Sequence, residues 1–237
     1  MKQPWKEGDD STAIFSANTI ADRGLRLAIP FLLLGVHLLA LALVLGSGAM
    51  VSIAVLMLVY ELPPAGKETV IPLGILLGFP WWAIAGSIAL VDVEVGLFMV
   101  WNFDLAERIP ILGPWIRRFI LAGREFLAER PWLSRLYFFG IVVMVMVPFF
   151  GSGGVRGSIV GRLLGMSRRW VMEAIVTGAM IGSLGIALAT LYLRQAFLES
   201  LFTGAAAILL LIAAGAALYW IAKRFLGGEA EGREPGK

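Results

Sequence analysis

The sequence predicts an all-α integral membrane protein with four full transmembrane helices and two re-entrant helical hairpins, which together form an inverted repeat. The first observation is composition: hydrophobic residues make up 59% of the 237 residues and charged residues 16%, with a mean hydropathy of +0.83. Soluble domains average about 45–50% apolar and about 25% charged residues. The other two observations are the lengths of the apolar runs and a Pro/Gly-rich break that occurs twice.

The first half of the chain contains the longest charge-free run, residues 27–60. It is too long for one helix, because about 20 apolar residues cross a bilayer, and the Gly-Ser-Gly segment 46–48 divides it. The proline pair in segment 61–68 cannot continue a helix, because proline removes a donor and clashes with the preceding turn. We therefore expect a span at 27–45, short arms at 49–60 and 69–79 around this tip, and a span at 81–101.

The second half follows the same order after a charged, amphipathic linker at 102–135. A short apolar arm ends at a Pro/Gly-rich tip, 148–154, and a second arm and two full spans follow. The expected elements are arms at 136–147 and 156–166 and spans at 171–193 and 201–222. Polar tails at 1–22 and 227–237 then flank a single membrane domain, 23–226, with repeat one at 49–101, repeat two at 136–193 and a last span at 200–222.

The two hairpins align without gaps at an offset of 87 residues, so that Gly66 falls on Gly153 and Gly74 on Gly161. Each hairpin returns to its own side of the membrane, and one span and the linker separate them, so the two must enter from opposite faces. Broken helices in an inverted repeat are typical of transporters that bind substrate near the bilayer midplane. The plainer interpretation is a membrane protein with kinked helices and no transport.

Charge supports this topology. It places both termini, the linker and the loop at 167–169 on one side of the membrane, which collects 16 of the 20 Lys and Arg residues. Cytoplasmic flanks of membrane helices are enriched in Lys and Arg. We therefore expect a multi-pass protein of the plasma membrane with both termini in the cytoplasm.

Composition also argues against several classes of function. The chain has no cysteine and one histidine, which excludes thiol catalysis and thiolate metal sites and argues against a histidine metal site. No phosphate-binding glycine loop, nucleophile elbow or paired-histidine motif is present. We expect neither an enzyme nor a bound metal or other cofactor, and no nucleic-acid partner.

An anion site is predicted where the second hairpin turns back. Arg156 follows the glycine-rich tip, where the free amides and positive dipole end of a helix favour an anion, and an arginine adds a bidentate fork. Lys67 at the other tip would add charge. The candidate substrate-binding residues are Arg156, Lys67, Gly153, Gly154 and Arg162. The alternative is that Arg156 pairs with Glu61 or Glu68 and only holds the two tips together.

Carboxyl groups in or near the membrane are the candidates for proton coupling, since burial makes a carboxyl group titrate closer to neutral pH. They are Glu61 and Glu68 at the first tip and Asp92 and Glu94 in the following span. Asp92 and Glu94 are two residues apart and point to different faces of a helix. At most one of them can therefore face the hairpins, and we favour Asp92. The alternative is that one faces solvent near a helix end or pairs with Arg162.

Three further expectations concern single residues within the spans. His37 is expected to form a hydrogen bond between helices rather than to relay protons. Glu173 is expected to be interfacial. Gly178, Gly182 and Gly185 form a small-residue face on the expected span 171–193. This face could mediate a homodimer, but we favour the alternative that it packs the span against the second hairpin.

Two pairs of segments resemble the signatures of the putative small multi-drug export protein family. The first pair is ELPP at 61–64 with IPLGI at 71–75, and the second is VPFFGSGG at 147–154 with GRLLGM at 161–166. The resemblance covers residues 49–190. It implies roles for Glu61 and Arg156, while Lys67-Glu68 stands where the family usually has an arginine.

That family looks like a branch of the DedA superfamily, also called SNARE-associated or VTT proteins. The resemblance implies two inverted re-entrant hairpins and a role in moving lipids, including polyprenyl-phosphate carriers, across the bilayer. We therefore expect a transporter, proton-coupled through a carboxyl group, of an anionic lipid such as a polyprenyl phosphate or phospholipid, or of another amphipathic anion. Its partners would be membrane lipids and its substrate. Two alternatives stay open: a small multi-drug exporter of cationic compounds, and a membrane scaffold without transport.

Overall fold

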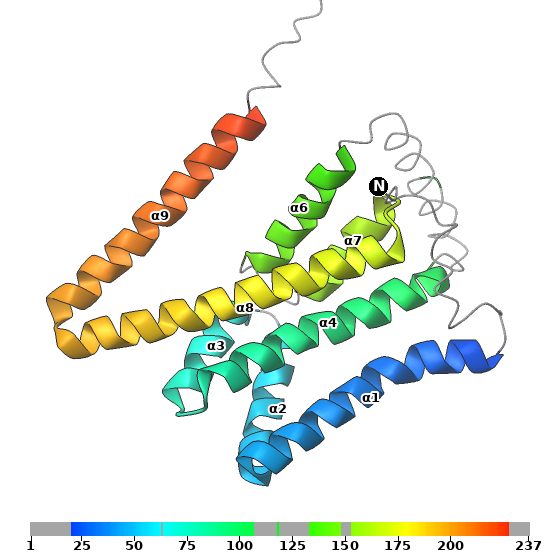
Figure 1. Cartoon of the computed structure of the whole chain (residues 1–237), viewed down its shortest axis with the longest axis horizontal. Helices are drawn as coiled ribbons and strands as arrows, with labels where there is room; N and C mark the ends of the chain where they lie inside the picture. The colour runs from blue at the N-terminus through cyan, green and yellow to red at the C-terminus, as the bar shows by residue number, and fades with distance from the viewer. Residues whose placement is uncertain (1–19, 63, 107–117, 119–132, 148–152, 228–237) are drawn as a thin grey trace, which may run out of the picture. The chain divides into compact units, whose positions relative to one another are not determined.

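The computed structural model describes residues 20–62, 64–106, 118, 133–147 and 153–227, and the regular structure among them is α-helical (Figure 1). Several expected segments lie outside the described residues. They are residues 1–19 of the first tail, the second tail from residue 228, most of the linker, and residues 148–152 of the second hairpin's tip. The chain divides into two compact units, Met1–Ala187 and Leu188–Lys237.

The helices of the first half are close to the expected ones: α1 Ile20–Leu45, α2 Ser47–Glu61, α3 Lys67–Leu76 and α4 Trp81–Ala106. The single residue Gly46, with a φ of 89°, turns the chain between α1 and α2. α3 begins two residues earlier than the expected arm, because Gly66 is its N-cap residue. This shift moves Lys67 from the tip into the first turn of a helix.

The second half contains α6 Leu133–Met146, α7 Gly153–Leu163, α8 Arg168–Glu199 and α9 Leu201–Gly227. α7 begins three residues before the expected arm, so Gly153 and Gly154 belong to its first turn and not to the tip. α8 runs through the boundary between the two units. In the second unit, the Ser200 hydroxyl accepts from the Thr203 amide at 3.0 Å and caps α9.

Among the residues that the structure describes, three helices are long and apolar enough to cross a membrane: Gly24–Leu45, Trp81–Phe103 and Arg168–Glu199. They correspond to three of the four expected spans. In α9 the described apolar segment is the shorter Phe202–Ala217, so the fourth span stays a prediction, as does the re-entry of the hairpins into the membrane.

The predicted repeat has a counterpart in the hydrogen bonds of the two hairpins. Gly78 and Gly165, which are 87 residues apart, both have a positive φ, of 90° and 76°. In each case the next amide donates to a glycine carbonyl five residues earlier at 3.1 Å, from Phe79 to Gly74 and from Met166 to Gly161. This pattern is a Schellman-type end, and it stops α3 and α7 earlier than expected.

The helix that follows each hairpin also packs at the same place. A Cβ on Gly74 would meet the side chain of Ile84 in α4, and a Cβ on Gly161 would meet that of Val171 in α8. Ile84 and Val171 are again 87 residues apart. Two segments of different sequence therefore close their hairpins against the next helix in the same way.

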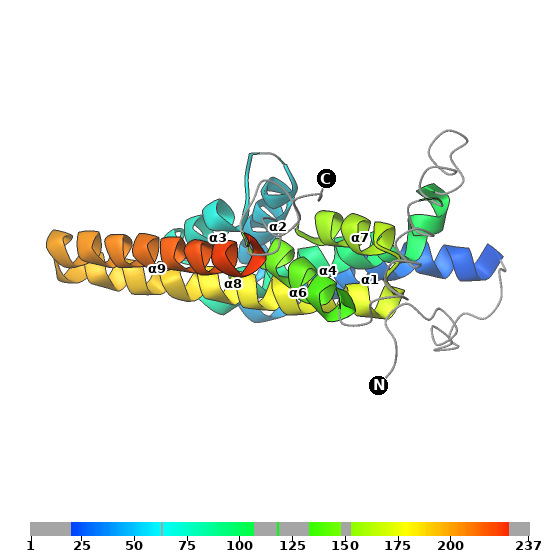
Figure 2. The same cartoon turned by 90° about the horizontal axis from the view of Figure 1, so that it is seen from above.

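Within the first unit, α4 is the helix around which the others pack. It contacts α1, α2, α3 and α7, and Figure 1 shows it between α1 and the antiparallel α8. Figures 1 and 2 show α2 and α3 beside the first part of α4 and α7 beside its second part. Both hairpins can therefore reach the middle of α4.

Two of the three predicted small residues pack α8 against α6. A Cβ on Gly178 would lie 2.6 Å from the backbone oxygen of Val142, and one on Gly182 would lie 2.7 Å from that of Met146. Gly185 has no such neighbour within 4 Å. The favoured alternative, packing against the second hairpin, is thus confirmed for Gly178 and Gly182.

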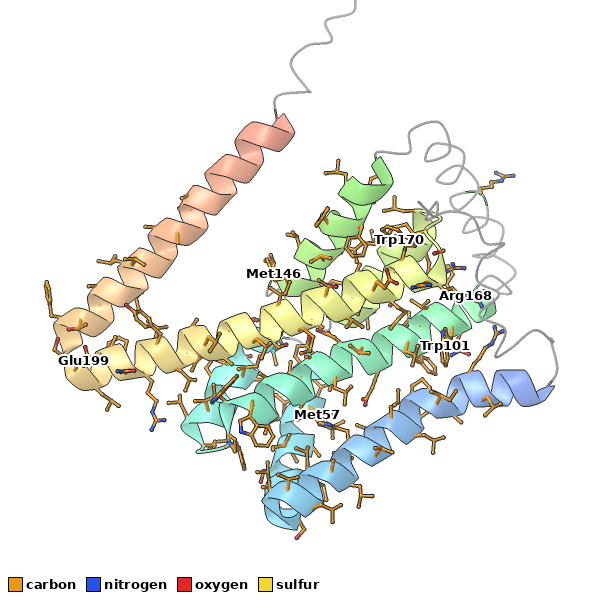
Figure 3. All side chains as sticks on the ribbon, viewed as in Figure 1. Met57, Trp101, Met146, Arg168, Trp170 and Glu199 are labelled. Atoms are coloured by element: carbon orange, nitrogen blue, oxygen red, sulfur yellow. The ribbon has the colours of Figure 1, made fainter. Side chains whose placement is uncertain are left out.

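Aromatic and basic side chains gather at one end of the first unit. Figure 3 shows Trp101, Arg168 and Trp170 at this end, and the Trp170 ring meets Phe138 edge-on at 5.4 Å. Tryptophan with flanking arginine is typical of the cytoplasmic membrane interface. The side of the membrane on which this end lies stays a prediction.

Candidate functional site

A buried carboxylate in α4 is the centre of the polar contacts between the hairpins. Asp92 lies midway along the candidate span Trp81–Phe103, and its side chain is 0% exposed. Its Oδ1 accepts from the Tyr60 hydroxyl at 2.8 Å and from the Gly154 amide at 3.0 Å. The Gly153 amide in turn donates to the Tyr60 hydroxyl at 3.3 Å.

The other carboxylate oxygen forms an ion pair. The Lys67 Nζ lies 2.6 Å from Asp92 Oδ2, and the lysine side chain is only 3% exposed. The same Nζ donates to the backbone oxygen of Val145 at 3.0 Å. Lys67 is the first residue of α3 and Val145 is the last but one of α6. The Lys67 ammonium therefore links the first hairpin to the second and also forms the ion pair with Asp92.

The two hairpins therefore meet crosswise at Asp92. The start of α3 meets the end of α6 through Lys67 and Val145, and the start of α7 meets the end of α2 through Gly153 and Tyr60. Helix N-termini carry partial positive charge and free amides that stabilise an anion. We call the group formed by Tyr60, Lys67, Asp92, Gly153 and Gly154 the hairpin centre.

Small residues let α7 approach α4 closely enough to form this centre. A Cβ on Gly154 would overlap the backbone oxygen of Asp92, so no larger residue fits there without moving a helix. One turn further on, the buried Ser158 hydroxyl lies 3.3 Å from the Gly96 carbonyl and 2.6 Å from the Gly154 carbonyl.

The predicted substrate-binding residues separate into two groups. Lys67, Gly153 and Gly154 lie in the hairpin centre, and Arg156 is half-buried in the first turn of α7. Arg162 is buried near the other end of that helix, where its Nη1 donates to the Met166 carbonyl at 3.2 Å and its guanidinium lies 5.7 Å from the Phe103 ring centre. The structure thus does not bring Arg162 to the hairpin centre.

The predicted proton-coupling residues are also divided. Asp92 faces the hairpins, as favoured, while Glu94 is buried on a different side of α4. Glu61 is the partly buried last residue of α2, and Glu68 is exposed in the first turn of α3. One alternative is wrong, because neither Asp92 nor Glu94 faces solvent. Asp92 forms an ion pair with Lys67, which α3 carries to the middle of α4.

Of two predictions about single residues outside the centre, the hydrogen bond of His37 between helices is confirmed, and the interfacial position of Glu173 stays a prediction. His37 Nε2 lies 2.9 Å from the Ser87 hydroxyl, which links α1 to α4. Glu173 is exposed near the start of α8 and accepts from Arg169 Nε at 2.8 Å.

Sequence reasoning missed two members of the site. Tyr60 was read only as the end of an apolar arm, although a buried tyrosine hydroxyl usually needs a hydrogen-bond partner. Its position next to the Glu61-Leu62 segment was the available signal. The Val145 carbonyl left no signal, because any residue supplies a backbone oxygen.

Comparison with known proteins gives one family. Residues 67–184 match the model of the putative small multi-drug export protein family. The matched range contains Lys67, Asp92, Gly153 and Gly154, and it begins just after the tip that holds Glu61. No curated protein and no solved structure matches the chain.

Proposed function

We propose that this protein is a proton-coupled membrane transporter that moves an anionic lipid, or another amphipathic anion, through the hairpin centre. One observation carries the proposal: donors from both hairpins converge on a single buried carboxylate, that of Asp92. The Tyr60 hydroxyl and the Gly154 amide donate to it, and the Lys67 ammonium forms an ion pair with it. A phosphate or carboxylate head group would use the same donors, so Asp92 occupies the place that a substrate anion would take.

Protonation of Asp92 is the proposed coupling step. A neutral Asp92 loses its ion pair with Lys67 and releases donors that a head group can then accept from. Loss of the proton restores the carboxylate, which competes with the bound anion for Lys67 and the α7 amides. Proton and anion therefore bind together and leave together. Arg156, in the first turn of α7, is proposed to add a second positive charge near the entering head group.

The membrane arrangement belongs to the same proposal. We infer a DedA-like inverted pair of re-entrant hairpins in the plasma membrane, with both termini in the cytoplasm and Asp92 near the bilayer midplane. Midplane binding at broken helices is the usual arrangement of secondary transporters. A homodimer is compatible with it but is not required by the centre.

A second candidate is an exporter of cationic compounds, which the family match at residues 67–184 favours. In that case Asp92 would be the counter-ion of the substrate, and the Lys67 ammonium would be the resident cation that the substrate displaces. The two candidates make opposite predictions for Lys67. Removal of its charge weakens the binding of an anion but removes the competitor of a cation.

The test is flux in proteoliposomes that contain the full-length protein. The probes are a fluorescent polyprenyl phosphate, a fluorescent acidic phospholipid and a cationic dye, each with and without a pH gradient. We expect the anionic lipids to cross faster with the protein, Lys67→Met to lose most of this acceleration, and Asp92→Asn to lose its dependence on the gradient. Glu173→Gln, which changes an exposed carboxylate in α8, is the matched control and should behave as wild type.

Each outcome decides between the candidates. Dye flux that survives or rises in Lys67→Met, with no lipid flux, would replace the anion proposal by the cation exporter. No flux of any probe would leave the scaffold alternative. Lipid flux that is unchanged in both Lys67→Met and Asp92→Asn would contradict the hairpin centre as the binding site.

A further inference from the structure

The side of α4 that faces α1 carries polar residues that the hairpin centre does not use. Near the start of α4, Ser87 contacts His37. Further along, the Phe98 ring meets the Phe31 ring edge-on at 6.1 Å. The order of these contacts shows that α1 and α4 run antiparallel along a shared interface, as Figure 1 also shows.

Glu94 lies on this same side of α4. Ser87, Glu94 and Phe98 are seven and four residues apart, and residues at such spacings share one face of a helix. Asp92, two residues before Glu94, points instead to the hairpins. The two acidic residues therefore serve two different interfaces of one helix, both near the middle of the candidate span Trp81–Phe103.

Glu94 is enclosed but not paired. Its side chain is 6% exposed, and its Oε1 is buried without a hydrogen-bond partner within the described part of the chain. An isolated carboxylate in a low-dielectric site is far more costly than the neutral acid. Asp92 avoids this cost through Lys67, the Tyr60 hydroxyl and the Gly154 amide, whereas no group on the described residues does the same for Glu94.

The charged and titratable groups on the surrounding helices support this contrast. From α1 they are Arg26, whose backbone oxygen accepts from Asn102 at 3.4 Å, and His37, which contacts Ser87. About 10 Å of helix separates Ser87 from Glu94, at 1.5 Å per residue. The other described groups on helices that pack against α4 are Tyr60 and Glu61 in α2, Lys67 and Glu68 in α3, and Arg156 and Arg162 in α7. The part of α8 in the first unit, whose Ile175 would meet a Cβ on Gly96 of α4, adds Arg168, Arg169 and Glu173 near its start.

We propose that Glu94 is a second proton-binding site, located between α1 and α4 and separate from the hairpin centre. The step is the reversible binding of one proton to a carboxylate oxygen, with no other reactant. As a site for a coupling proton it rests on the transport proposed above, while the binding of the proton itself does not. Two buried acids on opposite interfaces of α4 would let one helix respond both to the substrate and to pH.

Infrared spectroscopy of the reconstituted full-length protein tests the proton directly, through the carbonyl stretch of a protonated carboxylic acid. We expect this absorption at neutral pH in wild type and in Glu68→Gln, which changes an exposed glutamate and is the control. It should be absent in Glu94→Gln, should persist in Asp92→Asn, and should disappear reversibly as the pH of wild type is raised. An unchanged absorption in folded Glu94→Gln overturns the proposal. If Glu94→Gln does not fold, Glu94→Asp is measured instead and must shift the absorption. An unshifted absorption in Glu94→Asp also overturns the proposal.

Flux then separates this inference from the proposed function. The effect of a pH gradient on lipid flux should be smaller in Glu94→Gln than in wild type and absent in Asp92→Asn. If the infrared absorption depends on Glu94 but no probe is transported, the proton site stands and the transport proposal fails. If transport occurs and the gradient acts equally on wild type and Glu94→Gln, a coupling role for Glu94 is contradicted.

Discussion

Lys67 and Asp92 form a buried ion pair between α3 and α4. Both side chains are buried, and their charged atoms lie 2.6 Å apart. Removal of one partner from a buried ion pair leaves an uncompensated charge and costs about 3–5 kcal/mol, whereas replacing both partners by neutral groups is often close to neutral. Stability and function at this pair can therefore be separated.

We predict that Lys67→Met and Asp92→Asn each lower the melting temperature of the purified protein in detergent. The double variant should melt closer to wild type than either single variant, because no unpaired charge remains. If the pair only holds the hairpins together, the stable double variant will still transport. If it is the binding centre, the double variant will be folded and inactive. Equal and additive losses in a double-mutant cycle would argue against a direct interaction.

At the residue scale, the sequence identified several residues of the hairpin centre but not the contacts between them. A lysine at a proline-rich tip and an aspartate in mid-span were both candidates, because charge inside a membrane is costly and needs a reason. Their pairing was not predicted, since it depends on the start of α3 and the middle of α4 reaching the same point. Arg162 was a candidate for the same reason as Lys67. It lies nine residues after Gly153 along α7, which takes it away from the hairpin centre.

Among the elements, the contact between α6 and α8 depends on two glycines. We predict that Gly178→Ala and Gly182→Ala each destabilise the protein by about 1–3 kcal/mol, because the added methyl group would press on a backbone oxygen of α6, which cannot rotate away as a side chain can. Gly185→Ala is the matched control and should be neutral or stabilising, since its position is open and alanine favours helix by about 1 kcal/mol over glycine. Thermal unfolding of the three variants in detergent measures this.

The oligomeric state of these variants decides between the two roles of the glycine face. If the face packs only within the chain, the three alanine variants will elute from a sizing column as wild type does, whatever their stability. A change of oligomeric state in Gly185→Ala, without loss of stability, would instead favour the homodimer.

The elements were predictable because each break has a local chemical cause. The Pro-Pro tip ended α2, and Gly46 separated α1 from α2. The ends of α3 and α7 were placed too late, since the apolar pattern continues past Leu76 and Leu163 while the backbone has already turned toward Gly78 and Gly165. Hydrophobicity reports the surroundings of a segment and says little about the residue at which its helix stops.

For the whole molecule, the two hairpins of the first unit show how two segments with matching backbone ends can carry an asymmetric site. The same hydrogen-bonded ends recur 87 residues apart, yet Lys67 falls on Gly154 and Asp92 on Ala179. The first repeat supplies the charges, and the second supplies the glycine amides and the close approach of α7 to α4. The shared backbone was visible in the sequence as matched glycines, whereas the division of roles required coordinates.

The predicted topology can be tested on this chain with unusual simplicity, because it has no cysteine of its own. Ser47, the first residue of α2, and Arg169, the second residue of α8, are both exposed. Figure 1 shows the starts of these two helices at opposite ends of the first unit. If Lys and Arg mark the cytoplasmic side, a membrane-impermeant maleimide will label Ser47→Cys in intact cells and Arg169→Cys only after the membrane is opened. The reverse pattern would invert the protein in the membrane and with it the direction of the proposed flux. Labelling of both positions in intact cells would mean that α4, the one expected full span between them, does not carry the chain across the bilayer, and the hairpin centre would then no longer lie at its midplane.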